Sequence, residues 1–204
     1  MFFNFRGCIS VRSASFERKT KETNINIALE LGGAGENEIR TGVGFFDHML
    51  NLLAFRGGFV LRLTCDGDLQ VDAHHTVEDV GICLGQALKT AMGDKGGIAR
   101  YGTASLPMDE ALVNVALDVS GRGLLVYNAE ISAQMCGAFP TEMTEEFFRA
   151  LAHNAGITLH INVPYGKNAH HIIEGMFKAV GNALAHAMEI AVPGGAPPST
   201  KGVI

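Results

Sequence analysis

A five-residue pattern, His-His-x-x-Glu, occurs twice in this chain and constrains its fold more than any other feature. It runs from His74 to Glu78 and again from His170 to Glu174. Identical residues then recur at the same spacing: Gly85 with Gly181, Ala87 with Ala183, Leu88 with Leu184, Ala91 with Ala187 and Met92 with Met188. Self-similarity at a fixed spacing is the signature of a repeated structural unit.

An earlier stretch repeats as well. Residues 22–35 match residues 110–123, with shared Glu, Asn, Ala, Leu and two Gly positions. We predict an α+β fold made of an internally duplicated unit, in which each half is a small, mostly antiparallel sheet with two helices packed on one face. Residues 1–204 would form a single domain of two repeats, at about 9–95 and 96–192, followed by a C-terminal tail at 193–204.

Hydrophobic periodicity predicts the individual elements. Strands are expected at residues 9–20, 24–31, 59–65, 112–119, 124–131 and 157–163, and helices at 47–55, 74–92, 145–155 and 170–190. Asp47 is the expected N-cap of the first helix, and Gly57-Gly58 is expected to end it. The helix at 74–92 has an apolar stripe formed by Val77, Val80, Gly81, Leu84 and Leu88.

The spacing within the repeated pattern is typical of a metal site. Positions i and i+4 of a helix lie one turn apart on the same face, so His74 and Glu78 can hold one ion together. The adjacent His75 lies about 100° further round the helix and is free to serve another ion. Because the second copy repeats this arrangement, the chain suggests two metals, each shared between the two halves.

Two further ligands come from the helices that precede the pattern in each half. Superposing the halves aligns His48 with Glu146, and a carboxylate can replace an imidazole as a ligand. One predicted set is His48, His75, His170 and Glu174, and the other is His74, Glu78, Glu146 and His171. Mixed imidazole and carboxylate ligands suit Mn²⁺, Zn²⁺ or Fe²⁺, whereas this many histidines argue against Mg²⁺. A single His-His pair on a helix is usually exposed and binds no ligand, but two copies with the same downstream glutamate favour metal binding.

Composition excludes several classes of function. The net charge of −5 and the lack of a basic run argue against nucleic acid as a partner. Cys8, Cys65, Cys83 and Cys136 show no paired spacing, which favours reduced thiols and a cytoplasmic location. No apolar run reaches the length of about 18 residues that a membrane span needs, so no membrane partner is expected.

Six longer motifs make the chain resemble the imidazoleglycerol-phosphate dehydratase family. They are TGVGFFDHML at 41–50, DAHHTVED at 72–79, MDE at 108–110, DVSGR at 118–122, GKNAHHIIE at 166–174 and PSTKG at 198–202. The similarity runs from about residue 9 to the C-terminus, and several long motifs in the same order make it specific.

The resemblance implies a hydro-lyase that converts D-erythro-imidazole-glycerol phosphate to imidazole-acetol phosphate in histidine biosynthesis. It also implies two Mn²⁺ ions per active site. The family further implies a homo-oligomer of 24 subunits built from trimers, with active sites shared between subunits. By position, it supports the eight ligands named above.

The resemblance also implies which residues contact substrate. These are Glu22, His48, Arg56, His74, His75, Arg100, Arg122, His170, Lys178, Ser199, Thr200 and Lys201. The last three lie in the tail, which would therefore be a substrate-binding segment. Two positions depart from the family, since Glu146 and Arg56 stand where relatives commonly have histidine.

The chemistry of this dehydration explains why paired ions are expected. The proton to be removed lies on a carbon that bears a hydroxyl and has no adjacent carbonyl, so the imidazole ring must accept the electrons. Metals on both ring nitrogens can hold the ring as an imidazolate, which expels the hydroxyl on the neighbouring side-chain carbon to give a diazafulvene-like intermediate. Glu22 is the expected base, because a carboxylate near the ions suits proton abstraction. Arg100, Arg122, Ser199 and Lys201 would hold the phosphate.

Two alternatives stay open at this point. One is a dimetal hydrolase of a small phosphorylated metabolite, since paired ions also activate water. The other is a non-catalytic shell assembled by metal. The phosphate-type residues Arg100, Arg122 and Lys201 speak against the shell, and the appearance of ketone rather than free phosphate would exclude the hydrolase.

Overall fold

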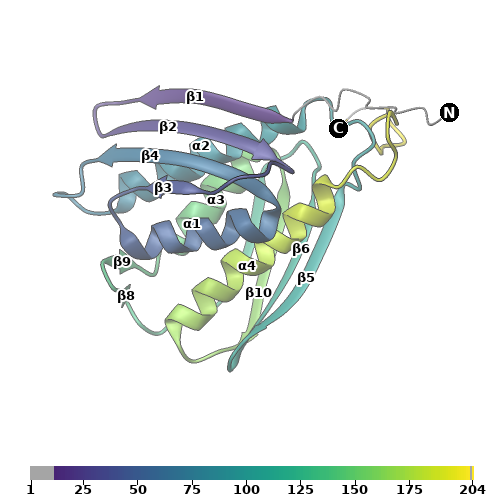
Figure 1. The fold of residues 1–204 in the computed structure, drawn as a ribbon. Coiled ribbons are helices and arrows are strands. Elements are labelled where there is room, and N and C mark those ends of the chain that lie inside the picture. Colours follow the sequence, from purple (N-terminus) through teal and green to yellow (C-terminus); the bar gives the residue numbers. More distant parts are fainter. Residues whose placement is uncertain (1–11, 203) are drawn as a thin grey trace.

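Two four-stranded sheets and four long helices make up the fold in a computed structural model, which describes residues 12–202 and 204 (Figure 1). The first half contains β1 (Ser13–Lys19), β2 (Thr23–Leu31), β3 (Glu38–Arg40), α1 (Gly44–Gly57), β4 (Phe59–Gly67) and α2 (His74–Met92). The second half contains β5 (Tyr101–Met108), β6 (Ala111–Asp118), β7 (Leu124–Asn128), β8 (Met135–Cys136), β9 (Phe139–Pro140), α3 (Met143–Ala155), β10 (Thr158–Tyr165) and α4 (Ala169–Met188). The predicted α+β class is confirmed.

The two large sheets have the same topology. Their strand orders are β1-β2-β4-β3 and β5-β6-β10-β7, and in each the final pair is parallel while the other pairs are antiparallel. The registers correspond too, because Arg62 pairs with Ala28 in the first sheet and His160 pairs with Ala116 in the second. Superposing the two repeats aligns these same residues. Matching registers are what a duplicated unit would give.

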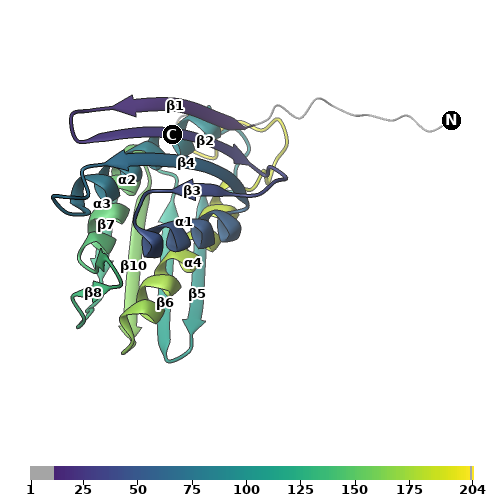
Figure 2. The ribbon, with the colours of Figure 1, turned by 60° about the vertical axis from the view of Figure 1, so that its left-hand side comes forward.

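The helices lie between the two sheets (Figures 1 and 2). Helices α1 and α2 pack on the first sheet, and α3 and α4 pack on the second. The halves are joined through their helices, because α2 packs against α3 and α1 against α4. The predicted apolar stripe of α2 is fully buried in this layer, as are the side chains of Phe46, Phe139, Phe147, Phe148 and Phe177.

Each helix pair crosses at a glycine. A methyl group added at Gly85 of α2 would lie 2.7 Å from the carbonyl oxygen of Leu151 in α3. At the equivalent Gly181 of α4, it would lie 2.7 Å from the carbonyl oxygen of Leu53 in α1. These distances are shorter than van der Waals contact, so only glycine allows the backbones to approach this closely.

Several predicted boundaries were wrong. Helix α1 begins at Gly44, and Asp47 is not its N-cap; its carboxylate instead accepts hydrogen bonds from the backbone N–H and the hydroxyl of Thr41. The strands β3 and β5 were not expected. The strand predicted at 9–20 is β1, although residues 9–11 lie outside the described residues. The predicted stop at Gly57-Gly58 is confirmed, because Gly58 caps α1 with a φ of 64°.

Long apolar helices are absent from the part of the chain that the structure describes. None of its helices combines the length and the hydropathy needed to cross a membrane.

Candidate metal centre

Three predicted ligands converge where α1 and α4 begin. His48 comes from α1, and His170 and Glu174 come from the first turns of α4. One ligand atom from each lies within 4.8 Å of the other two. The Oε2 atom of Glu174 lies 3.1 Å from His170 Nε2 and 3.5 Å from His48 Nε2. The structure therefore brings together three of the four residues in the first predicted set.

Local capping fixes the start of α4. The side chain of Asn168 accepts hydrogen bonds from the backbone N–H groups of His170 and His171, which would otherwise lack partners. The imidazole of His170 packs edge-on against Phe45, with ring centroids 5.1 Å apart. These contacts orient the histidine before any ion binds.

Glu174 is the buried member of the cluster, with 7% of its surface exposed. Burial raises its pKa, but hydrogen bonds from Lys178 and His170 outweigh that effect and lower the pKa overall. The carboxylate is therefore ionised at neutral pH. Two imidazoles and an ionised carboxylate form a donor set that suits Mn²⁺, Zn²⁺ or Fe²⁺, so the residues present fit the expected metal.

His75 lies outside this cluster within the chain. Its Nδ1 atom lies 3.0 Å from a carboxylate oxygen of Asp68, and its Nε2 atom lies 3.8 Å from Glu22 Oε1. The hydrogen bond that the His75 ring donates to the Asp68 carboxylate raises the pKa of His75. A carboxylate on one ring nitrogen fixes the tautomer and leaves the other nitrogen available as a ligand.

His171, the counterpart of His75, has a closer carboxylate neighbour. Its Nδ1 atom lies 2.7 Å from Glu110 Oε2, and this hydrogen bond raises the pKa of His171. The Glu110 carboxylate also accepts hydrogen bonds from the backbone N–H groups of Asn168 and Lys167. These hydrogen bonds together lower the pKa of Glu110 to about 2, and the bond from the backbone N–H of Asn168 has the largest effect.

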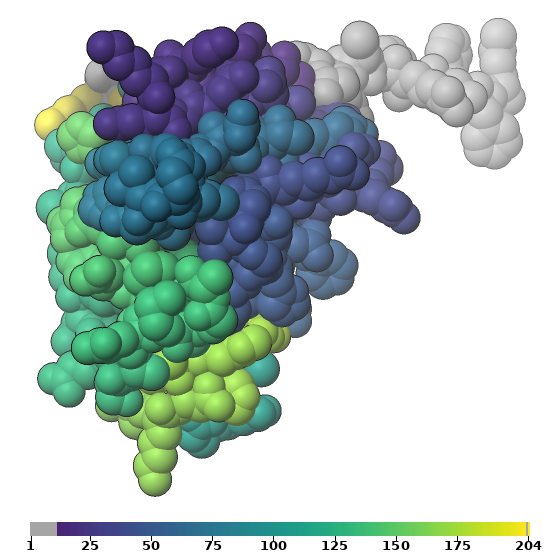
Figure 3. All heavy atoms as spheres, turned by 90° about the vertical axis from the view of Figure 1, so that its left-hand side faces the viewer, coloured from purple at the N-terminus to yellow at the C-terminus, as the bar shows by residue number. Residues whose placement is uncertain are grey.

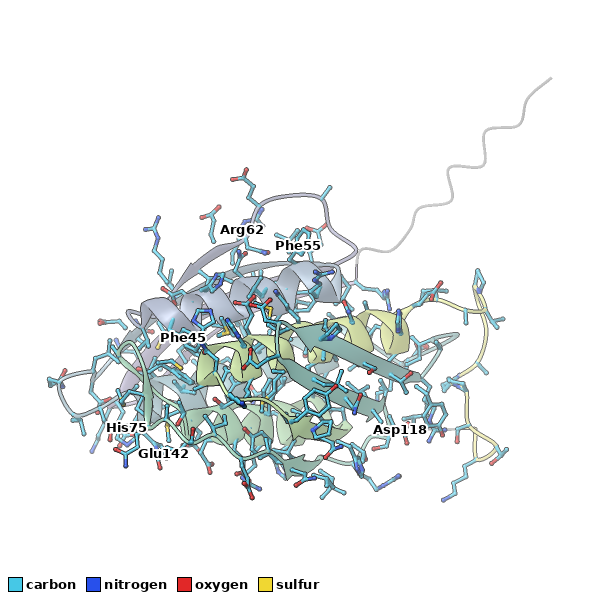
Figure 4. The ribbon with its side chains drawn as sticks, turned by 90° about the horizontal axis from the view of Figure 1, so that it is seen from below. Phe45, Phe55, Arg62, His75, Asp118 and Glu142 are labelled. Carbon is cyan, nitrogen blue, oxygen red and sulfur yellow. The ribbon has the colours of Figure 1, made fainter. Side chains whose placement is uncertain are left out.

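Two residues of the second predicted set lie at a different depression. His74 and Glu146 both line a cavity of about 410 Å³, together with Glu142, Glu145 and Tyr127. The His74 ring lies 3.9 Å from Glu78, one turn along α2. Figure 4 shows His75 and Glu142 at the same end of the molecule. On this face, first-half residues meet second-half residues, as the change from blue to green in Figure 3 shows.

The expected phosphate-binding residues lie at the other end. Arg100 donates from Nε to Asp118 at 2.8 Å and from Nη1 to the Pro198 carbonyl at 2.9 Å, which fixes the tail beside it. Asp118 lies opposite His75 in Figure 4. The backbone N–H of Arg100 donates to Ala187, near the end of α4. Seventeen residues separate Ala187 from His170, so about 25 Å of helix lies between them at 1.5 Å per residue.

The other predicted substrate residues divide between the two ends. Lys178 belongs to the metal cluster, because its Nζ atom lies 2.5 Å from Glu174 Oε1. Arg122 is exposed and held by Ser120, in the loop before β7. Arg56 is exposed in the last turn of α1, about 12 Å along the helix from His48. Ser199, Thr200 and Lys201 lie in the tail, partly or fully exposed.

Sequence reasoning missed two carboxylates beside the histidines. Asp68 lies in the loop just after β4 and was not among the predicted site residues. Glu110 was included in a motif, but its hydrogen bond to His171 was not anticipated. The repeat contained the signal for the second residue, because Glu110 aligns with Glu22.

Comparison with known proteins gives one consistent result. The family model for imidazoleglycerol-phosphate dehydratase matches residues 41–184. The imidazoleglycerol-phosphate dehydratase of Oceanobacillus iheyensis is 55% identical over 192 residues, covering 94% of this chain and 99% of that protein. The enzyme of the same name from Lactococcus lactis is 56% identical over 199 residues, covering 95% and 98%.

Solved structures agree with the sequences. The imidazoleglycerol-phosphate dehydratase of Staphylococcus aureus superposes with a TM-score of 0.79 at 42% identity, covering 86% of this chain and 97% of that one. The Pyrococcus furiosus enzyme, in complex with (S)-C348, superposes with a TM-score of 0.80 at 37% identity, covering 93% and 100%.

Proposed function

The chain belongs to the imidazoleglycerol-phosphate dehydratase family and is a hydro-lyase of histidine biosynthesis. On that premise we propose which of its residues bind the substrate, hold the metal ions and take the proton. The proposed substrate is D-erythro-imidazole-glycerol phosphate, and the product is imidazole-acetol phosphate. The imidazole ring would bind at the histidine end of the molecule and the phosphate at the Arg100 end. The observation that carries this proposal is the cluster of His48, His170 and Glu174.

A complete site would combine surfaces from more than one copy of the chain. His170 and Arg100 are separated by about 25 Å of helix α4, which is much longer than a substrate with a short carbon chain. One chain therefore cannot hold both ends of the same substrate molecule. A homo-oligomer that places the histidine end of one copy beside the arginine end of another removes this difficulty. The proposed assembly is the 24-subunit particle built from trimers.

Two Mn²⁺ ions are the proposed cofactors, with Zn²⁺ or Fe²⁺ as substitutes. His48, His170 and Glu174 would hold one ion with His75, and His74, Glu78, Glu146 and His171 would hold the other. Since His75 lies outside its set within one chain, it would join that set from a neighbouring copy. When bound, the ions would act as Lewis acids on the ring nitrogens.

The protein residues would orient the substrate and move the proton. Arg100 and Arg122 offer planar guanidinium groups to the phosphate, with Ser199, Thr200 and Lys201 of the tail beside them. Glu22 lies just before β2, with its Oε1 atom 3.8 Å from His75 Nε2, and its carboxylate would take the carbon-bound proton. The hydroxyl on the ring-side carbon would leave as hydroxide and the next carbon would give its proton to Glu22, so that one water is lost in total and the resulting enol would become the ketone.

Glu22→Gln tests the proposed base. The amide keeps the shape of the side chain but cannot accept a proton, so turnover should be abolished while metal content and substrate binding stay near wild type. Glu17→Gln, an exposed change on β1 away from the site, is the matched control and should retain activity. Assays should follow ketone and free phosphate together. Normal turnover in Glu22→Gln would remove that residue from the role, and release of phosphate without ketone would indicate a hydrolase.

We also propose that the chain arose as two repeats, at about 9–95 and 96–192, within one domain. The equal strand orders and registers of the two sheets support this division.

A further inference from the structure

The guanidinium group of Arg100 is held by three neighbours. Its Nε and Nη2 atoms lie 2.8 Å and 3.4 Å from the two carboxylate oxygens of Asp118, which makes the pair bidentate. Its Nη1 atom donates to the Pro198 carbonyl at 2.9 Å, and its central carbon lies 4.9 Å from the centroid of the Tyr101 ring. Because an arginine side chain has five N–H groups, the hydrogen bonds among the described residues leave one on Nη1 and one on Nη2 for a ligand.

The backbone of Arg100 is also constrained. Its φ of 74° lies in the left-handed region that favours glycine. Its N–H donates to the Ala187 carbonyl, and its own carbonyl accepts from the N–H of Val119. A non-glycine residue keeps such a conformation only where the surrounding structure holds it, and strain of this kind is common at ligand sites. The start of β5 therefore holds this arginine in one place.

The Pro198 carbonyl connects Arg100 to the C-terminal tail. It directly precedes a turn at residues 199–202, in which the N–H of Lys201 donates to the Ser199 hydroxyl and the N–H of Gly202 donates to the Ser199 carbonyl. Ser199 and Lys201 are proposed phosphate ligands. An Arg100 side chain that stays in place therefore also keeps this turn beside it.

The first half of the chain lacks this arrangement at the matching positions. The registers of the two sheets match Arg100 with Arg12 and Asp118 with Glu30. The backbone contact is the same, because the carbonyl of each arginine accepts from the residue after the acidic one, at 3.0 Å and 2.9 Å. In the described part of the chain no ion pair joins Arg12 to Glu30, and Arg12 donates to the Met188 carbonyl instead. The strand ends of the first half therefore pack without such a pair.

We infer that Asp118 is a positioning residue for the substrate phosphate, because it holds the Arg100 guanidinium in the orientation that fixes the tail and leaves two N–H groups for phosphate oxygens. Asp118 itself does not touch the phosphate in this scheme, since like charges repel. The inference rests on the proposed role of Arg100 at the phosphate.

Two effects of Asp118 on phosphate binding oppose each other. Its negative charge lowers the attraction of the site for an anion, whereas the order that it gives to a long side chain removes an entropic cost of binding. Both side chains of the pair are partly exposed, and charges act weakly where water reaches them. The ordering effect therefore outweighs the repulsion.

Asp118→Asn tests this role. The amide keeps the shape of the side chain but directs an N–H group at the arginine, so the bidentate pair is lost. The inhibition constant of inorganic phosphate and the KM of the substrate should both rise roughly 3- to 10-fold, the cost of ordering one long side chain on binding, with kcat within about twofold. Imidazole, which would bind at the histidine end, should inhibit as in the native enzyme. Glu30→Gln is the matched control and should leave all four constants near their native values.

Ionic strength separates ordering from charge. Salt at about 0.5 M screens the charge that Asp118→Asn removes, so the weakening of phosphate binding should persist or grow there. A native or lower inhibition constant for phosphate in this variant would overturn the inference. An equal rise for phosphate and imidazole, or a weakening that disappears at high salt, would also overturn it.

The native enzyme gives an independent test that does not depend on the folding of a variant. In crystals soaked with inorganic phosphate, the anion should contact Nη1 or Nη2 of Arg100 while both contacts to Asp118 remain. An arginine that leaves Asp118 in order to reach phosphate would contradict the positioning role.

Arg100→Met distinguishes this inference from the proposed function. Unchanged inhibition by phosphate in that variant would remove Arg100 as a phosphate ligand, and both would fail. Weaker inhibition in Arg100→Met, together with native inhibition in Asp118→Asn, would defeat only the positioning role. In the Arg100→Met background, Asp118→Asn should weaken phosphate binding no further, whereas a general structural defect would add its own loss.

Discussion

Lys178 and Glu174 lie one turn apart on α4, with Lys178 Nζ 2.5 Å from Glu174 Oε1. The other oxygen of Glu174 faces His170 and His48. One carboxylate therefore divides its two oxygens between a fixed ammonium group and the candidate metal position. The ammonium orients the carboxylate, but its charge also opposes a cation bound nearby.

Lys178→Met should separate these two effects. Methionine keeps most of the aliphatic stem and removes the charge, so the affinity for Mn²⁺ should be equal to or higher than in the native protein. Turnover should fall at least about tenfold, because the variant loses both a substrate contact and the fixed orientation of Glu174. Metal content by elemental analysis and kcat by product assay provide the two measurements. Loss of bound metal would contradict the expected repulsion.

Glu110 should make the free energy of unfolding depend on pH in the acid range. Its pKa is lowered from 4.5 to about 2 in the folded chain, chiefly by the backbone N–H of Asn168. A lowered folded-state pKa contributes stability that is present above pH 4.5 and is lost as the pH falls toward about 2. Glu110→Gln should therefore unfold at lower urea concentration than the native chain at pH 7. The gap between the two midpoints should narrow between pH 4.5 and 3, and a constant gap would show that Glu110 is not responsible.

The crossing glycines predict a steric cost. Gly85→Ala and Gly181→Ala each place a methyl group 2.7 Å from a carbonyl oxygen of the facing helix, so the helices must separate. Each change should lower the free energy of unfolding by about 1–3 kcal/mol. Gly44→Ala is the matched control, because nothing lies within 4 Å of the added carbon, and it should stay within about 0.5 kcal/mol of the native chain. Urea midpoints measure all three, and equal midpoints would mean that the crossings are looser than described.

The contrast between α2 and β5 shows what the sequence could predict about the fold. Helix α2 was predicted with its observed bounds, because a regular apolar stripe is a local signal. Strand β5 was missed because its inner face begins with small residues, Gly102 and Ala104, where α4 packs closely. A methyl group at Gly102 would lie 1.9 Å from the carbonyl oxygen of Ala183. The alternation of polarity that identifies a strand is therefore weak there.

The candidate site, like the fold, could be predicted from the sequence only where the signal is local. Helical spacing was enough to predict that Glu174 lies beside His170. His48 was chosen as a histidine near the start of the preceding helix, and the repeat supplied Glu146 as its counterpart. No local pattern could show that His75 would turn toward Asp68, since that contact depends on the loop between β4 and α2. Nor could spacing show that Arg100 lies at the far end of α4. Both facts depend on how the helices pack across the two halves.

Metal removal should affect assembly as well as turnover. If each site takes ligands from neighbouring copies, the free energy of metal binding also stabilises the contacts between them. Chelation should then abolish activity and reduce the particle to smaller species in sedimentation velocity, and added Mn²⁺ should reverse both. His48→Ala should show the same change without chelator, whereas His153→Ala, an exposed histidine in the last turn of α3, should not. An unchanged sedimentation profile after complete metal removal would show that the ions do not hold the copies together.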